Sequence, residues 1–237
     1  MRNFNRKNDE LRKISIQTDI NKFSEGSCKI AFGNTEIICT ASVESNLPRW
    51  LQGSSSGWIT AEYNMLPRST PKRSSREAKV GKQSGRTMEI QRLIGRSLRS
   101  IIDLKRLKGF QIVLDCDVIQ ADGGTRTTSI TGAYIALNHA LKKMVQDKDI
   151  KLNPIKDKLC AVSCGIVKDE TMLDLDYEED FSAMVDANFV FSQNSGIVEI
   201  QASGEECTFT KQQFDEMYKL ALKGADKIFK TQEGFLK

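Results

Sequence analysis

The chain has 237 residues, of which 39% are hydrophobic and 28% are charged, and its formal net charge is +4. This composition is typical of a globular protein with a sizeable core, and no run approaches the roughly 20 apolar residues that a membrane span needs. The basic N-terminus is not followed by an apolar signal-peptide core. We therefore expect a cytoplasmic protein with no membrane partner, organised as a single domain over residues 1–237.

The cysteines and the single histidine exclude several kinds of catalytic and metal site. Six cysteines are scattered through mostly apolar runs without a CxxC pair, so we expect buried, reduced thiols rather than a zinc site or disulfides. His139 lies in an apolar, helical pattern. Nuclease mechanisms that need a histidine base, and a Ser-His-Asp triad, therefore lack a candidate.

The first half of the chain begins with strands. Apolar, β-prone runs at residues 28–32 and 36–43 flank Gly33-Asn34, a pair that favours a hairpin turn, and residues 57–63 form a third strand. Residues 67–85 are polar, basic and without periodicity, which predicts a long, mobile loop.

Helices and a further strand follow. Apolar residues recur at helical spacing from Ile90 to Ile102, and the other side of this helix carries Arg92, Arg96 and Arg99. Solvated surface positions are an alternative for these three arginines. Residues 110–119 alternate as a strand, and a glycine-rich segment then leads into an apolar helix that extends to about residue 144.

The second half repeats the pairing of strands with a later helix. Strands are expected at residues 159–167, 172–175, 187–191 and 196–202, and the closing helix starts at a capping box of Thr210 and Gln213. The order of elements predicts an α+β (mixed α/β) fold of two similar β-α halves.

Residues 122–129, Asp-Gly-Gly-Thr-Arg-Thr-Thr-Ser, form the most informative segment. Two glycines allow the backbone N–H groups to approach an anion, and the helix start behind them favours phosphate. Arg126 adds a two-pronged donor, and the hydroxyls of Thr125 and Ser129 can complete the shell. The spacing is not that of a P-loop. An ordinary glycine turn with hydroxyl helix caps remains an equal alternative at this point.

Two further segments carry charge suited to the same chemistry. Residues 81–87 place glycines and Arg86 directly before the helix expected from Ile90 to Ile102. Arg86 and Arg126 can therefore reach one anion if the starts of the two helices converge. A solvated basic loop is the alternative. The acidic residues 173–186 include Asp180 and Asp186, a pair suited to Mg²⁺, with a solvated acidic loop as the alternative. Residue chemistry alone therefore reaches a phosphate-binding or phosphoryl-transfer site.

Four long motifs, at residues 57–68, 81–99, 115–127 and 177–188, resemble the ribonuclease PH family of phosphorolytic 3′ exoribonucleases. The likeness extends from Arg2 to about Gln232, and the departures at Pro71 and Ala202 lie away from the motifs for phosphate and carboxylates. It implies the fold shared with polynucleotide phosphorylase, assembled as a homohexamer (a trimer of dimers). It also implies that inorganic phosphate, as co-substrate, attacks the 3′-terminal phosphodiester of tRNA precursors and releases a nucleoside diphosphate.

The resemblance also assigns roles to residues of this chain. Asp180 and Asp186 are implied as the catalytic pair, which binds Mg²⁺ or assists protonation of the leaving 3′ oxygen. Phosphate would be held by Arg86, Gly124, Thr125, Arg126 and, as a further candidate, Ser129. The RNA would be bound by Arg68, Arg73, Arg76, Arg92, Arg96 and Arg99.

Two other functions are weighed against this one. Relatives of the fold that have lost their active site act as non-catalytic RNA-binding ring subunits, but such a subunit should lack some of the four residues Arg86, Arg126, Asp180 and Asp186, all of which are present. A small-molecule kinase would need a nucleotide-base pocket and would turn over ATP rather than depend on phosphate.

Overall fold

The computed structural model describes residues 2–205 and 207–236 and contains two β-sheets. The first sheet has five strands in the order β1-β2-β3-β5-β4, with β4 and β5 parallel and the other neighbours antiparallel. Its strands are β1 (Ile14–Thr18), β2 (Gly26–Phe32), β3 (Thr35–Glu44), β4 (Trp58–Met65) and β5 (Gln111–Gln120). Buried and accessible residues alternate along β3 and β5, so one face of this sheet packs on the core.

The second sheet has four antiparallel strands in the order β7-β6-β8-β9. These strands are β6 (Leu159–Val167), β7 (Glu170–Leu173), β8 (Val185–Ser192) and β9 (Gly196–Gly204). Every residue of β6 is buried, because helices cover both faces of the sheet at this strand.

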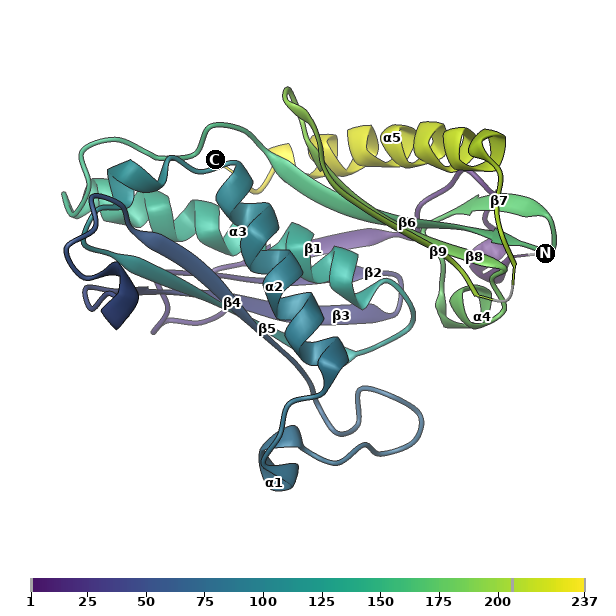
Figure 1. Ribbon diagram of the computed structural model, residues 1–237, viewed down its shortest axis with the longest axis horizontal. Helices are drawn as coiled ribbons and strands as arrows, with labels where there is room; N and C mark the ends of the chain where they lie inside the picture. Colours follow the sequence, from purple (N-terminus) through teal and green to yellow (C-terminus); the bar gives the residue numbers. More distant parts are fainter. Residues whose placement is uncertain (1, 206, 237) are drawn as a thin grey trace.

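Helices connect and cover the sheets, as Figure 1 shows. The helix α3 lies between the two sheets, α2 packs beside it on β4, and α5 covers the opposite face of the second sheet. Two short helices, α1 and α4, lie in connections. The bounds are α1 (Glu77–Val80), α2 (Gly85–Ser100), α3 (Thr125–Gln146), α4 (Tyr177–Phe181) and α5 (Lys211–Glu233), with 3₁₀ turns at Asn3–Asn5, Arg49–Leu51 and Leu104–Leu107.

The sequence of α3 suits its position between two sheets. Its residues are buried around most of the helix circumference, as expected for a helix without a solvent face. Close approach to β2 requires glycine at position 26, where an added Cβ would lie 2.1 Å from the carbonyl oxygen of Ala136. The middle of α3 is thereby held against β2, and the start of the same helix carries the glycine-rich segment.

The main elements expected from the sequence are confirmed, with four differences. Residues 67–85, expected as a loop, contain the short helix α1 at Glu77–Val80. The strand at residues 14–18 was not predicted, and the strand expected at 172–175 ends at Leu173 because Asp174 has a positive φ of 54°. The acidic connection contains a short helix, α4, which Asp176 and Glu179 start with a capping box. Cysteines of the described chain are free, and Cys207 alone among them is partly accessible. Within that same part of the chain, no helix is both long and apolar enough to cross a membrane.

Candidate active site

The glycine-rich turn between β5 and α3 has a backbone that side chains rarely adopt. Gly123 and Gly124 have φ values of +76° and +66°, and Gly124 is the N-cap of α3. A Cβ at position 123 would lie 2.5 Å from the carbonyl oxygen of Leu175. Glycine is therefore required here both for the backbone angle and for the close packing of the turn against the connection before α4.

We expect Gly123→Ala to lower stability by about 2 kcal/mol or more, because it combines left-handed backbone strain with a steric clash. Urea unfolding followed by circular dichroism measures this change. Gly109→Ala is the matched control, since Gly109 has a φ of +89° but no atom within 4 Å of an added Cβ. Equal losses in the two variants would show that packing against Leu175 contributes nothing.

Two arginines stand at the starts of neighbouring helices. Arg86 lies in the first turn of α2, which begins after the N-cap Ser84, and its side chain is exposed. Arg126 lies in the first turn of α3, where its Nη1 donates to Oε1 of Gln201 on β9 at 2.8 Å and lies 3.4 Å from Oε1 of Glu89. The second sheet thus orients an arginine that the first half of the chain supplies.

Tyr63 links β4 to the same helix start and was not identified from the sequence. Its hydroxyl donates to Oγ1 of Thr125 at 2.9 Å, and only 2% of the residue is exposed. Burial raises the pKa of Tyr63, whereas the bond to Thr125 and the charges of Arg86 and Arg126 lower it. Both arginines are therefore close enough to act on this buried phenol.

The carboxylates of Asp180 on α4 and Asp186 on β8 complete the group. Burial, and next the negative charge of Asp180, raise the pKa of Asp186 to about 6, against the opposing charges of Arg126 and Arg86. The pKa of Asp180 is also raised, mainly by burial, and the same two arginines oppose it. The structure therefore brings together two cations and two carboxylates from four elements, α2, α3, α4 and β8.

The carboxylate pair has the donor chemistry that a hard divalent cation prefers. Burial and mutual repulsion disfavour two negative charges here, and a cation would relieve both effects. Glu205 adds a third negative charge that raises the pKa of Asp180. Over residues 2–205 and 207–236, no cluster of three or more histidine, cysteine or acidic side chains forms a complete metal site. The chain would supply two ligands and leave others to water and substrate, as Mg²⁺ sites commonly do.

Three of the expected site residues have other surroundings. Ser129 is fully buried, with 0% of the residue exposed and no partner for its hydroxyl within the described chain, so it does not reach the phosphate side of α3. The guanidinium of Arg96 pairs with Glu199, with Nε to Oε2 at 2.7 Å. Arg99 donates to the carbonyl oxygen of Ile59 at 2.8 Å and stacks over the ring of Trp58. Internal contacts thus already engage both arginines.

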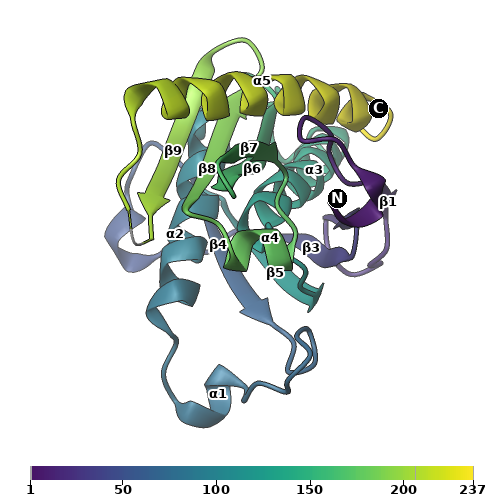
Figure 2. The same cartoon turned by 90° about the vertical axis from the view of Figure 1, so that its right-hand side faces the viewer.

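The basic connection between β4 and α2 projects away from both sheets, as Figures 1 and 2 show. Arg68, Arg73 and Arg76 are exposed there, and Arg92 is exposed on α2. The connection is tied to α2 by Glu77, whose Oε1 accepts from Oγ1 of Thr87 at 2.7 Å and from the N–H of Ser84 at 3.2 Å.

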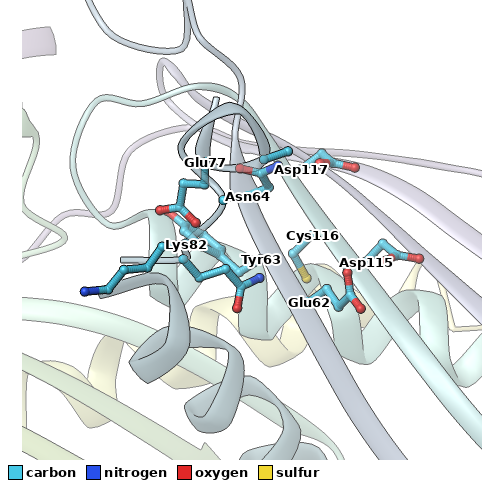
Figure 3. Close-up of a pocket in the computed structure, with 11 residues that line it drawn as sticks. Glu62, Tyr63, Asn64, Glu77, Lys82, Asp115, Cys116 and Asp117 are labelled. Carbon is cyan, nitrogen blue, oxygen red and sulfur yellow. The ribbon is translucent and has the colours of Figure 1, made fainter. Parts of the chain in front are cut away.

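A cavity of about 430 Å³ lies between this connection and the ends of β4 and β5 (Figure 3). Its lining includes Lys82 and the carboxylates of Glu62, Glu77, Asp115 and Asp117. Burial raises the pKa of both Asp115 and Asp117. An acidic lining repels phosphate, so the place suited to an anion is the start of α2 and α3 rather than this cavity.

Two family models match consecutive parts of the chain. Residues 10–143 match the 3′ exoribonuclease family, domain 1, and residues 157–224 match domain 2 of the same family. Among curated proteins, ribonuclease PH of Caulobacter vibrioides (strain NA1000 / CB15N) is 52% identical over 232 residues, which cover 98% of each chain. Ribonuclease PH of Maricaulis maris (strain MCS10) is 49% identical over 237 residues, the whole of both chains.

Solved structures share the fold at lower identity. Rice (Oryza sativa) Rrp46 is 18% identical with a TM-score of 0.79, covering 98% of this chain and 99% of that one. The Archaeoglobus fulgidus exosome with RNA bound to the active site contains a chain that is 22% identical with a TM-score of 0.80, covering 95% of this chain and 90% of that one. The matches to both family models and to full-length relatives at about half identity agree. The chain therefore belongs to the 3′ exoribonuclease family.

Proposed function

We propose that this chain is a phosphate-dependent 3′→5′ exoribonuclease that trims the 3′ ends of tRNA precursors and releases nucleoside diphosphates. The arrangement that supports this proposal is the placement of Arg86 and Arg126 at the starts of α2 and α3, from which their charges lower the pKa of both Asp180 and Asp186. A non-catalytic RNA-binding subunit would have no need for two neighbouring carboxylates whose charges repel each other. The names of the curated relatives support the same activity.

The arginines and the start of α3 would bring two anions together. An oxygen of inorganic phosphate attacks the phosphorus of the terminal phosphodiester, and the bond from that phosphorus to the 3′ oxygen of the preceding nucleotide breaks. Arg86, Arg126 and the N–H groups at Gly124 and Thr125 would offset the repulsion between the two phosphates and the charge of the transition state. The leaving 3′ oxygen then takes a proton.

Asp180 and Asp186 would hold Mg²⁺, which when bound supplies positive charge to substrate phosphates. The carboxylates themselves would orient the reacting groups and remain able to exchange a proton near neutral pH, since the pKa of Asp186 is about 6.

The exposed arginines of the projecting connection would bind the RNA backbone. Replacing Arg68, Arg73 and Arg76 together with alanine should weaken binding and reduce the slope of log K against log salt by about 2, at roughly 0.7 per phosphate contact in single strands. Fluorescence anisotropy with a labelled tRNA at several salt concentrations measures the slope. Lys211→Ala, which removes an exposed cation on α5 paired with Asp215, is the control and should leave the slope unchanged. An unchanged slope in the triple variant would place the RNA elsewhere.

For the whole protein we propose a cytoplasmic homohexamer, a trimer of dimers, in which each chain acts as a single unit over residues 1–237. The single unit is supported by the full-length match to the ribonuclease PH relatives and by the helix α3, which packs on both sheets. Structural neighbours named as exosome cores support ring assembly as a property of the fold.

The deciding experiment incubates the purified protein with a 3′-extended tRNA and Mg²⁺, with and without inorganic phosphate. We expect shortening, with release of nucleoside diphosphates, only when phosphate is present. Binding without shortening would favour the non-catalytic ring subunit. Shortening that ignores phosphate would identify a hydrolase and overturn the mechanism.

A further inference from the structure

Arg12, in the segment before β1, is buried against the glycine-rich turn. None of its side chain is exposed, and its partner Asp174 is 3% exposed. Arg12 donates to Asp174 through its backbone N–H at 2.7 Å, through Nε at 3.1 Å and through Nη2 at 2.7 Å. The carboxylate therefore fixes both the main chain and the guanidinium of Arg12.

The remaining donors of this guanidinium go to the backbone of the turn. Nη1 donates to the carbonyl oxygen of Asp122, and Nη2 lies 3.3 Å from the carbonyl oxygen of Gly123. Thr35 on β3 assists, since its hydroxyl donates to the Gly123 carbonyl at 2.6 Å and accepts from the N–H of Asp122 at 2.9 Å. Arg12 and Thr35 thus hold two successive carbonyl groups on the inner side of the turn.

Holding these carbonyls also sets the direction of the N–H groups. In a planar trans peptide the N–H points opposite to the C=O. Drawing the carbonyls of Asp122 and Gly123 toward Arg12 therefore turns the N–H groups of Gly123 and Gly124 away from it. Within the described residues neither N–H donates to another protein group. Such successive free N–H groups bind anions.

A parallel set of contacts holds the carboxylate half of the site. Arg2 makes a two-pronged pair with Glu179, at 2.7 and 2.8 Å, and Nη2 of Arg6 donates to the same carboxylate at 3.2 Å. Glu179 precedes Asp180 on α4 and also caps that helix through the N–H of Asp176. The N-terminal segment therefore contacts the phosphate turn through Arg12 and the carboxylate helix through Arg2 and Arg6. The two sets meet at the backbone carbonyl of Asp174, which accepts from Arg2 at 3.3 Å and from Arg6 at 2.8 Å.

We propose that Arg12, paired with Asp174, is a positioning residue that presents the N–H groups of Gly123 and Gly124 to inorganic phosphate. Arg2 and Arg6 position the helix α4 in the same way, through their contacts with Glu179. This inference rests on the proposed function, because it assigns a task within the phosphate site of the same reaction. A general structural role would impair phosphate affinity, RNA affinity and kcat alike. A positioning role predicts instead that changing Arg12 and changing Glu179 affect different kinetic constants.

The test measures the KM for phosphate, the KM for RNA and kcat in two variants, together with calorimetric titration of inorganic phosphate alone. Arg12→Lys keeps the charge but cannot span the carboxylate and both carbonyls. It should raise the phosphate KM and Kd about tenfold or more, the loss expected for one charge-assisted hydrogen bond, with the RNA KM within about twofold. Glu179→Gln should lower kcat and leave the phosphate KM within about twofold.

Each variant has a matched control. Arg106→Lys makes the same replacement in an exposed pair with Asp103, and Glu178→Gln removes the neighbouring charge on α4, which touches Asn3 at 3.4 Å. Both should behave as the parent protein. If Arg12→Lys does not fold, the double variant Arg12→Gln with Asp174→Asn removes both buried charges together and should still raise the phosphate KM.

A parental phosphate KM and Kd in a folded Arg12 variant would overturn the positioning role while leaving the proposed function intact. Equal losses of phosphate and RNA affinity would overturn it as well, since they indicate general loosening. A parent protein that shortens RNA without phosphate would overturn both proposals, so the two failures are distinguishable.

Discussion

Arg126→Ala should reduce phosphate-dependent shortening of RNA by about 10³-fold or more, because in the proposed mechanism it removes one of the two cations that offset the charge of the reacting phosphates. Its guanidinium is held by Gln201 and acts on both carboxylates of the site, as Arg86 also does, so the variant leaves one of the two arginines in place. Steady-state rates at saturating RNA, measured over a range of phosphate concentrations, give the loss. Its folded state should persist, since the side chain lies at the accessible edge of α3.

Two companion variants make this result specific. Arg126→Lys keeps the charge without the two-pronged geometry and should retain part of the activity. Arg106→Ala, an exposed arginine remote from the site, should retain all of it. Unchanged phosphate-dependent activity in Arg126→Ala would remove this residue from the phosphate site.

Asp186→Asn should abolish most of the activity and at the same time stabilise the protein at neutral pH. In the folded protein the pKa of Asp186 is raised to about 6, so stability from this group is present at low pH and is lost as the pH rises through 6. Asparagine stays neutral and avoids that loss. The free energy of unfolding at pH 7.5 should therefore rise by about 1–3 kcal/mol, the range set by such a shift for a partly buried group.

Unfolding by urea at pH 4.5 and at pH 7.5 tests the stability change, which should be much smaller at the lower pH. The parent enzyme should also lose kcat/KM as the pH falls below about 6, because a protonated Asp186 no longer binds a cation. A loss above pH 6 instead would assign Asp186 as the proton donor. A variant less stable than the parent at pH 7.5 would contradict the repulsion with Asp180.

Much of the fold and of the candidate site follows from local sequence. The glycine pair before Arg126 predicted a turn at a helix start, and Asp186 was expected at the opening of a strand, where β8 places it. Hydroxyl side chains were harder to place, because their type does not tell how deep in the core their turn of the helix lies. Ser129 lies one turn beyond Thr125 on the same face of α3, but it is fully buried and does not reach the site.

What the sequence could not predict depends on contacts between distant segments. Helix α4 could have been found, since Asp176 and Glu179 have the spacing of a capping box. Arg12 gave no such signal, because its partners Asp174 and Asp122 lie 162 and 110 residues away along the chain. Tyr63 likewise resembles any other strand residue until Thr125 is placed opposite its hydroxyl.

The position of α3 has an evolutionary consequence. It belongs to the segment that matches domain 1, yet it covers one face of the sheet formed by the segment that matches domain 2. A chain divided in the connection between α3 and β6 would leave the second sheet with an apolar face and no helix to cover it. The two segments are thus inherited as a pair: neither can be exchanged between proteins as an independent module unless its partner brings a substitute for this helix.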